Sequence, residues 1–325
     1  MPPSPQVPGS ESPVPSSKPR LSYAAKLWIT GLAFPTLLLI VAAIYINYRT
    51  PQIQLIEQIR QSKSLVWQMK IELDLPWMDK PTFWQDGSHI GKIVTNLPIP
   101  ASTAEYDWQL KLFGQVTELT LGVPRYRLPD ALLEKPPIFD QLPLLTSLRR
   151  LTFTQTSPTV EQIRVIQRIP SLRKLSFVHC ILARPVLQEL SRLDPAVELG
   201  LNLDQPLTSD EFQALAAIPS LTNLNVSPQF QLPDRGFEGF EKSTRLLTLV
   251  LFRQQLTTDT FRQIAKIKSL QFLFLPDCSF SEDDLIHLSD LPNLKHLILS
   301  KSTSPETLER LQQQLPNANI QLLPL

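Results

Sequence analysis

The sequence predicts an α/β solenoid, in which short parallel strands and helices alternate along the chain, preceded by one transmembrane helix. Three observations lead to this prediction. A six-residue block with alternating apolar residues recurs eight times, an amphipathic stretch follows most of these blocks, and one long uncharged apolar segment lies near the N-terminus. Repeated strand-and-helix units stack because none of them can bury its apolar face alone.

The chain begins with a Pro- and Ser-rich tail over residues 1–26. Its first 20 residues hold almost no bulky apolar side chains, so burial cannot offset the entropy lost on ordering. We therefore expect residues 1–26 to be disordered.

An uncharged, mainly apolar segment follows from Leu27 to Tyr48, between Lys26 and Arg49. About 20 such residues span the ~30 Å hydrocarbon core as a helix, so the segment is predicted to cross the cell membrane once. A cleaved signal peptide is the alternative, but its apolar region would normally be shorter. Basic residues flank both ends, so charge indicates the orientation only weakly. We expect an uncleaved anchor with the repeat domain on the extracytoplasmic side.

Residues 49–109 lack the repeat and contain four of the five tryptophans of the chain, at positions 67, 77, 84 and 108. The ends of a solenoid must be shielded from water. This segment is therefore predicted to form a juxtamembrane connection and an N-terminal cap, and its sequence pattern does not indicate which fold the cap adopts.

The repeats occupy residues 110–325. Their first positions are Val116, Leu148, Leu172, Ala196, Leu221, Leu246, Leu270 and Leu294. After a first interval of 32 residues the spacing is 24 or 25, and the alternating apolar residues of each block predict a short strand. The longer first interval includes PRYRLPDALLEKPPIFD, which we expect to protrude as a loop. The terminal NIQLL is predicted to be a truncated ninth strand.

The stretches between the blocks are predicted to be helices, because their apolar residues recur at helical spacing. Thr208 with Glu211, and Ser281 with Asp284, have the spacing of a capping box. Ser304 precedes Pro305, which suits the first position of a helix. Most of these helices are expected to stop at a proline, namely Pro170, Pro219, Pro292 or Pro316.

A strand and a helix within about 24 residues, with the consensus L-x-x-L-x-L, resemble the leucine-rich-repeat family, specifically its helix-containing, ribonuclease-inhibitor-like class. The layout of anchor, short segment and repeats resembles membrane-anchored leucine-rich-repeat proteins of planctomycete-type bacteria. The resemblance implies a horseshoe with parallel strands on the concave face and helices outside. It also implies a hydrogen-bonding side chain three residues after the end of each block, here Thr156, Cys180, Asp204, Gln229, Gln254, Cys278 and Ser302.

The two cysteines share this repeat position, four repeats apart. Neighbouring strands lie ~4.8 Å from each other, so Cys180 and Cys278 should be separated by roughly 19 Å. A disulfide needs Cα atoms within about 7 Å. Both are therefore predicted to be partly buried structural thiols.

Little in the sequence indicates catalysis. The 31 basic and 30 acidic residues nearly cancel, which argues against a nucleic-acid partner. No catalytic or metal-binding motif is present, so we expect no enzyme, cofactor or small-molecule substrate. His179 and Cys180 are adjacent, but neighbouring residues point to opposite sides. A site in the cap remains an alternative, with Asp74, Asp79, Asp86 and His89 as its candidates.

Strand residues that alternate with the core leucines should face the concave side. This surface begins with polar residues such as Arg150, Lys174 and Glu198 and ends with apolar ones. An exposed patch is predicted from Val250, Phe252, Phe272, Phe274 and Ile298, with Arg253 or His296 at its rim. Contiguous apolar patches often mark interaction sites. The alternative is that these residues only pack against one another or are covered by another element.

These features together indicate a membrane-anchored protein-binding or scaffolding module, whose concave face recognises a protein or peptide through phenylalanine anchors. The alternative function is a structural envelope or surface protein that associates with itself and has no dedicated ligand.

Overall fold

The computed structural model describes residues 39–56, 58, 66–73, 82–86, 89–93, 114–122, 138–227, 231–233, 235–300 and 303–323. Residues 39–56 are helical, so the helix continues past the predicted end of the membrane segment at Tyr48. The tail and residues 27–38 of that predicted segment lie outside the described residues. Among the helices that are described, none has the length and apolar character needed to cross a membrane.

The chain divides into two compact units, Met1–Thr50 and Pro51–Leu325. The described part of the second unit is built on one sheet of twelve strands, in the order β12-β11-β10-β9-β8-β7-β6-β5-β4-β1-β2-β3. Strands β4 to β12 pair in parallel and in chain order. This arrangement confirms the predicted α/β leucine-rich-repeat solenoid.

The parallel strands coincide with the predicted repeat blocks. They are β4 (Gly114–Gly122), β5 (Arg150–Thr154), β6 (Lys174–Val178), β7 (Glu198–Leu203), β8 (Leu221–Val226), β9 (Thr248–Leu251), β10 (Phe272–Leu275), β11 (His296–Ser300) and β12 (Asn319–Leu323). The last of them confirms the ninth strand expected from NIQLL.

Three antiparallel strands of the non-repeating segment extend the sheet at its other end. They are β1 (Val66–Leu73), β2 (Thr82–Asp86) and β3 (His89–Ile93). Strand β1 pairs antiparallel with β4, so the first repeat does not present an open edge on that side. Most of the predicted protruding loop lies outside the described residues, and its last residues begin α3 (Ile138–Gln141), which is followed by the 3₁₀ helix η3 (Leu142–Leu144).

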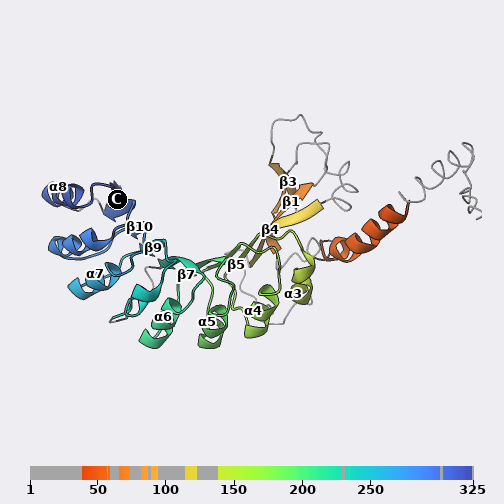
Figure 1. The fold of residues 1–325 in the computed structure, drawn as a ribbon, viewed down its shortest axis with the longest axis horizontal. Helices are drawn as coiled ribbons and strands as arrows, with labels where there is room; N and C mark the ends of the chain where they lie inside the picture. The colour runs from red at the N-terminus through yellow and green to blue at the C-terminus, as the bar shows by residue number, and fades with distance from the viewer. Residues whose placement is uncertain are drawn as a thin grey trace, which may run out of the picture. The chain divides into compact units, whose positions relative to one another are not determined.

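The helices lie along one face of the parallel strands (Figure 1). They are α4 (Val160–Ile166), α5 (Arg184–Leu190), α6 (Ser209–Ala216), α7 (Thr258–Ile264) and α8 (Pro305–Gln314), with a short 3₁₀ helix η4 (Phe240–Lys242) before β9. The predicted capping box of Thr208 and Glu211 is confirmed. Ser304 caps α8 with Pro305 in its first turn, also as predicted.

The predicted capping box at Ser281 is wrong. The backbone N–H of Asp284 donates to the Ser281 carbonyl at 3.0 Å, and a 3₁₀ helix, η5 (Glu282–Asp290), replaces the expected α-helix. Glu282 instead reaches the start of α8, where it accepts hydrogen bonds from the Ser304 N–H at 2.9 Å and from the hydroxyls of Ser304 and Thr307. These hydrogen bonds lower the pKa of Glu282. Ser281 makes no side-chain cap, and Glu282 links η5 to the start of α8 in the next repeat.

The core lies between the sheet and these helices. Every parallel strand from β4 to β11 buries at least one leucine, as at Leu151, Leu175 and Leu273. Each such leucine stabilises the fold by about 2 kcal/mol through the apolar area removed from water. Phenylalanines continue the stack between repeats: the ring of Phe153 lies 5.9 Å from that of Phe139 and 5.2 Å from that of Phe177. The core is thus continuous from one repeat to the next.

A register shift interrupts the regular pairing between β7 and β8. Leu199 pairs with Leu221, but Gly200 pairs with Asn223, so Thr222 is an extra residue on β8. Thr222 is buried, and its hydroxyl donates to the Leu199 carbonyl at 3.1 Å. From β8 onward, each block is therefore displaced along the sheet relative to the earlier ones.

Candidate functional site

The face of the parallel sheet opposite the helices carries the candidate site. Its residues alternate with buried leucines and align across strands through the parallel register. One such row contains Ser176, Gly200, Asn223, Thr248, Phe272 and His296. All of these residues are half-buried. The predicted alternation of inner and outer residues therefore holds on both sides of the register shift.

The structure brings the six predicted site residues together on three neighbouring strands, and we call this set the apolar patch. Phe274 lies in register with Val250 on β9 and with Ile298 on β11, and Phe272 lies in register with His296. Phe252 follows directly after β9 and is 37% exposed. The other five members are half-buried.

Ring stacking organises the apolar patch. The Phe272 ring lies parallel to the His296 ring, with centroids 4.9 Å apart and an interplanar angle of 3°. Phe272 and Phe274 also lie nearly parallel, with centroids 6.5 Å apart. Rings held by their neighbours lose little conformational entropy when a ligand covers them. The apolar patch is thus a preformed surface for an apolar or aromatic group.

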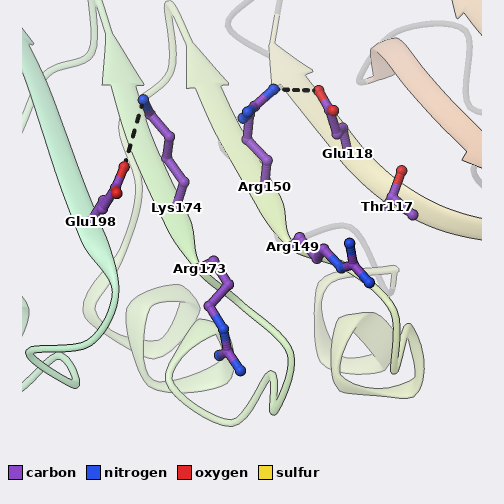
Figure 2. Close-up of a pocket in the computed structure, with 7 residues that line it drawn as sticks. All are labelled: Thr117, Glu118, Arg149, Arg150, Arg173, Lys174 and Glu198. Carbon is purple, nitrogen blue, oxygen red and sulfur yellow. Dashed lines mark hydrogen bonds and ion pairs between the residues drawn. The ribbon is translucent and has the colours of Figure 1, made fainter.

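A second feature of the same face is a cavity of about 390 Å³ over β4 to β7, which we call the basic pocket (Figure 2). It is lined by Thr117, Glu118, Arg149, Arg150, Arg173, Lys174 and Glu198. Two ion pairs cross its rim: Arg150 with Glu118 at 2.7 Å and Lys174 with Glu198 at 3.9 Å.

Arg149 and Arg173 are site residues that were not predicted from the sequence. Each directly precedes a strand and is exposed, and Figure 2 shows both side chains pointing away from Arg150 and Lys174, toward the N-terminal ends of β5 and β6. The signal was present in the blocks LRRLTF and LRKLSF, where a basic residue recurs at the second position after 24 residues. Both residues lie in turns, whereas the predicted site residues were taken only from alternate positions on the strands.

His179 and Cys180 do not form a nucleophile and base pair. His179 Nδ1 contacts the carboxylate of Asp204, whereas the Cys180 side chain is buried in the core. Burial raises the pKa of the Cys180 thiol, which disfavours the reactive thiolate. Both cysteines are unpaired. Two of the cap candidates, Asp74 and Asp79, lie outside the described residues.

The other two cap candidates, Asp86 and His89, are register partners where β2 and β3 meet. Within the described part of the chain, no three His, Cys, Asp or Glu residues are grouped so that they could hold a metal ion.

Comparison with known proteins found no matching family model and no matching curated protein. Among solved structures, an internalin of Listeria monocytogenes is 18% identical, with a TM-score of 0.37 and an alignment covering 57% of each chain. A PEPR1–AtPEP1 structure is 13% identical, with a TM-score of 0.31, covering 63% of this chain and 34% of the other. The chain thus spans less than two thirds of either protein. The assignment of the fold rests on the strands and helices described above.

Proposed function

We propose that this protein is a binding module without catalytic activity, which docks a protein or peptide on the concave face of a ribonuclease-inhibitor-like leucine-rich-repeat domain. The apolar patch carries this proposal. Aromatic side chains in partly enclosed positions are the commonest anchors of protein interfaces, and four of the six members of the apolar patch are aromatic rings. Phe252, at 37% exposure, leaves the most apolar area uncovered.

The position of the apolar patch supports binding rather than simple packing. The buried leucines beneath it, such as Leu249 and Leu273, already form the core with the helices. Phe272 and Phe274 lie on the opposite face, so removing them changes the core little. Ring contacts between strands add some stability to the sheet, but they leave the Phe252 ring exposed, which favours a binding role.

A library of random twelve-residue peptides, selected on the full chain in neutral detergent, tests this proposal. We expect enriched peptides with aromatic or large aliphatic residues, and Phe252→Ser with Phe274→Ser should weaken their binding at least tenfold, which corresponds to about 1.4 kcal/mol.

The matched control is Ile286→Ser, because Ile286 is a 46% exposed apolar residue on η5, away from the strands. Binding should survive this change. If the double variant binds the selected peptides as tightly as the original chain does, the apolar patch is not the docking surface. Enrichment of no peptide, together with concentration-dependent oligomers that the same two substitutions dissolve, would favour self-association instead.

We also propose that the chain is tethered to the cell membrane through Leu27 to Tyr48, with the repeats on the extracytoplasmic side, as in the planctomycete-type proteins that its layout resembles. In the described part of this segment the apolar side chains are exposed around the helix, for example Leu39 at 69%, Ile44 at 64% and Tyr48 at 59%. So much exposed apolar surface on one helix is unfavourable in water and favourable in lipid.

A further inference from the structure

We infer that the basic pocket is a second recognition site, which takes the carboxylates of an acidic peptide segment. This inference deepens the proposed function and rests on it, because the acidic segment belongs to the same ligand that places an apolar group on the apolar patch. The evidence is the charge around the pocket, the small polar residues beside it and its distance from the apolar patch.

The charge of the basic pocket is unbalanced. Among the described residues that line it, four are cationic and two, Glu118 and Glu198, are carboxylates. Arg150 and Lys174 each have an acidic partner, but neither Arg149 nor Arg173 forms an ion pair with any described residue. Arg173 has only a hydrogen bond from its guanidinium to the Leu172 carbonyl, at 3.0 Å. Two guanidinium groups, which suit bidentate binding of carboxylates, are therefore available to a ligand.

The two central cations also favour an anion between them. Arg150 and Lys174 are register partners on β5 and β6, and like charges directly opposite each other are destabilising. Figure 2 shows their side chains leaning apart, each toward its own acidic partner on the outer strand. A carboxylate seated between Arg150 and Lys174 would reduce this repulsion without displacing either existing ion pair.

Small polar residues lie beside the charged row. Thr120, Thr152 and Ser176 occupy the next position along β4, β5 and β6 on the same face, and Gly200 follows on β7. Their hydroxyl groups can donate hydrogen bonds to carboxylate oxygens, and their small size leaves room for a peptide backbone. A methyl group at Gly200 would already lie 3.3 Å from the Ser176 hydroxyl. The surface next to the basic pocket is therefore formed by small, mostly polar residues and not by bulky side chains.

The spacing allows one extended segment to reach both sites. The basic pocket is centred on β5 and β6 and the apolar patch on β10, about four strand spacings away from β6. At ~4.8 Å per spacing this is roughly 19 Å, which about six extended residues cover at ~3.3 Å each. The predicted ligand carries Asp or Glu about six positions from an aromatic or large aliphatic residue.

Fluorescently labelled hexaglutamate with a blocked C-terminus is a direct probe, because it has no apolar side chain and does not need the apolar patch. We expect the full chain in neutral detergent to bind it, with affinity falling as salt rises. Arg149→Gln with Arg173→Gln should lower the affinity at least tenfold. The control, Arg262→Gln with Lys266→Gln, removes the same charge from exposed positions at and after the end of α7 and should change it less than threefold.

Absence of hexaglutamate binding, or equal loss in the two double variants, would overturn the inference. Tight binding of inorganic phosphate without binding of hexaglutamate would overturn it in favour of a phosphate site. The peptides selected in the library experiment give an independent readout: they should be enriched in acidic residues at the stated spacing. The effect of Phe252→Ser with Phe274→Ser on binding of the selected peptides tests only the proposed function. Binding of hexaglutamate tests only the basic pocket, so the two proposals can fail separately.

Discussion

A turn residue just after β5, β6, β9 and β10 has the same unusual backbone conformation in all four repeats. Gln155, His179, Arg253 and Asp277 all adopt a positive φ between 50° and 53°, although none is glycine. This left-handed conformation costs a non-glycine residue about 1 kcal/mol. In three of these repeats the next side chain donates to a backbone carbonyl, as the family resemblance implied: Cys180 to Val178 at 3.5 Å, Gln254 to Phe252 at 2.8 Å and Cys278 to Leu251 at 3.0 Å.

The buried, structural position of the two cysteines predicts how fast their thiols react. Burial raises the pKa of Cys278 to about 11, and it also raises the pKa of the Cys180 thiol. At pH 8 only about one Cys278 side chain in a thousand is then a thiolate, the form that reacts with iodoacetamide. We expect slow alkylation of Cys278 in the folded protein, roughly tenfold faster for each unit between pH 8 and pH 10. Peptide mass spectrometry measures it, with urea-unfolded protein as the control, and rapid alkylation of the folded chain at pH 8 would contradict this assignment.

At the level of elements, the sequence predicts the strands better than the pairing between them. Alternating leucines locate β5 to β12 because one face of each strand must be buried. The register shift at Thr222 could not be predicted, because Leu221 and Leu224 fit the repeat whether or not an extra residue is accommodated. At the start of η5, which replaces the expected α-helix, Glu282 contacts Ser304, a residue of the next repeat. Both deviations lie where neighbouring repeats contact each other, and the pattern of a single repeat does not contain such contacts.

The junction of β4 and β5 gives a prediction at this scale. A Cβ atom at Gly122 would lie 2.2 Å from the backbone carbonyl oxygen of Thr154, which cannot move without disturbing β5. Gly122→Ala should therefore lower the free energy of unfolding by about 2 kcal/mol. The matched control is Gly200→Ala, where the nearest atom is the Ser176 hydroxyl, which can rotate away. Urea unfolding followed by circular dichroism measures both variants, and equal stability of the two would show that β4 and β5 are not packed this closely.

For the whole repeat domain, the sheet face opposite the helices separates into a charged part over β4 to β7 and an apolar part over β9 to β11. The apolar part could be predicted from the sequence, because Phe252, Phe272 and Phe274 alternate with the core leucines. They therefore lie on the face of the sheet that points away from the core. Only half of the charged part could be predicted in this way. Arg150 and Lys174 were visible on the strands, whereas Arg149 and Arg173 extend from turns, and only the stacking of neighbouring repeats brings them to one cavity.

The proposed membrane anchor makes the last prediction, which concerns the entire chain. If Leu27 to Tyr48 crosses the membrane with its N-terminus inside, protease added to intact cells, or to cells with only an outer barrier opened, should digest the repeats. A chain lacking residues 27–48 should leave the membrane fraction and, having no export signal, stay protected. Antibody detection of the fragments distinguishes these cases. Digestion only after the inner membrane is broken would place the repeats in the cytoplasm, where the basic pocket and the apolar patch would serve an intracellular ligand.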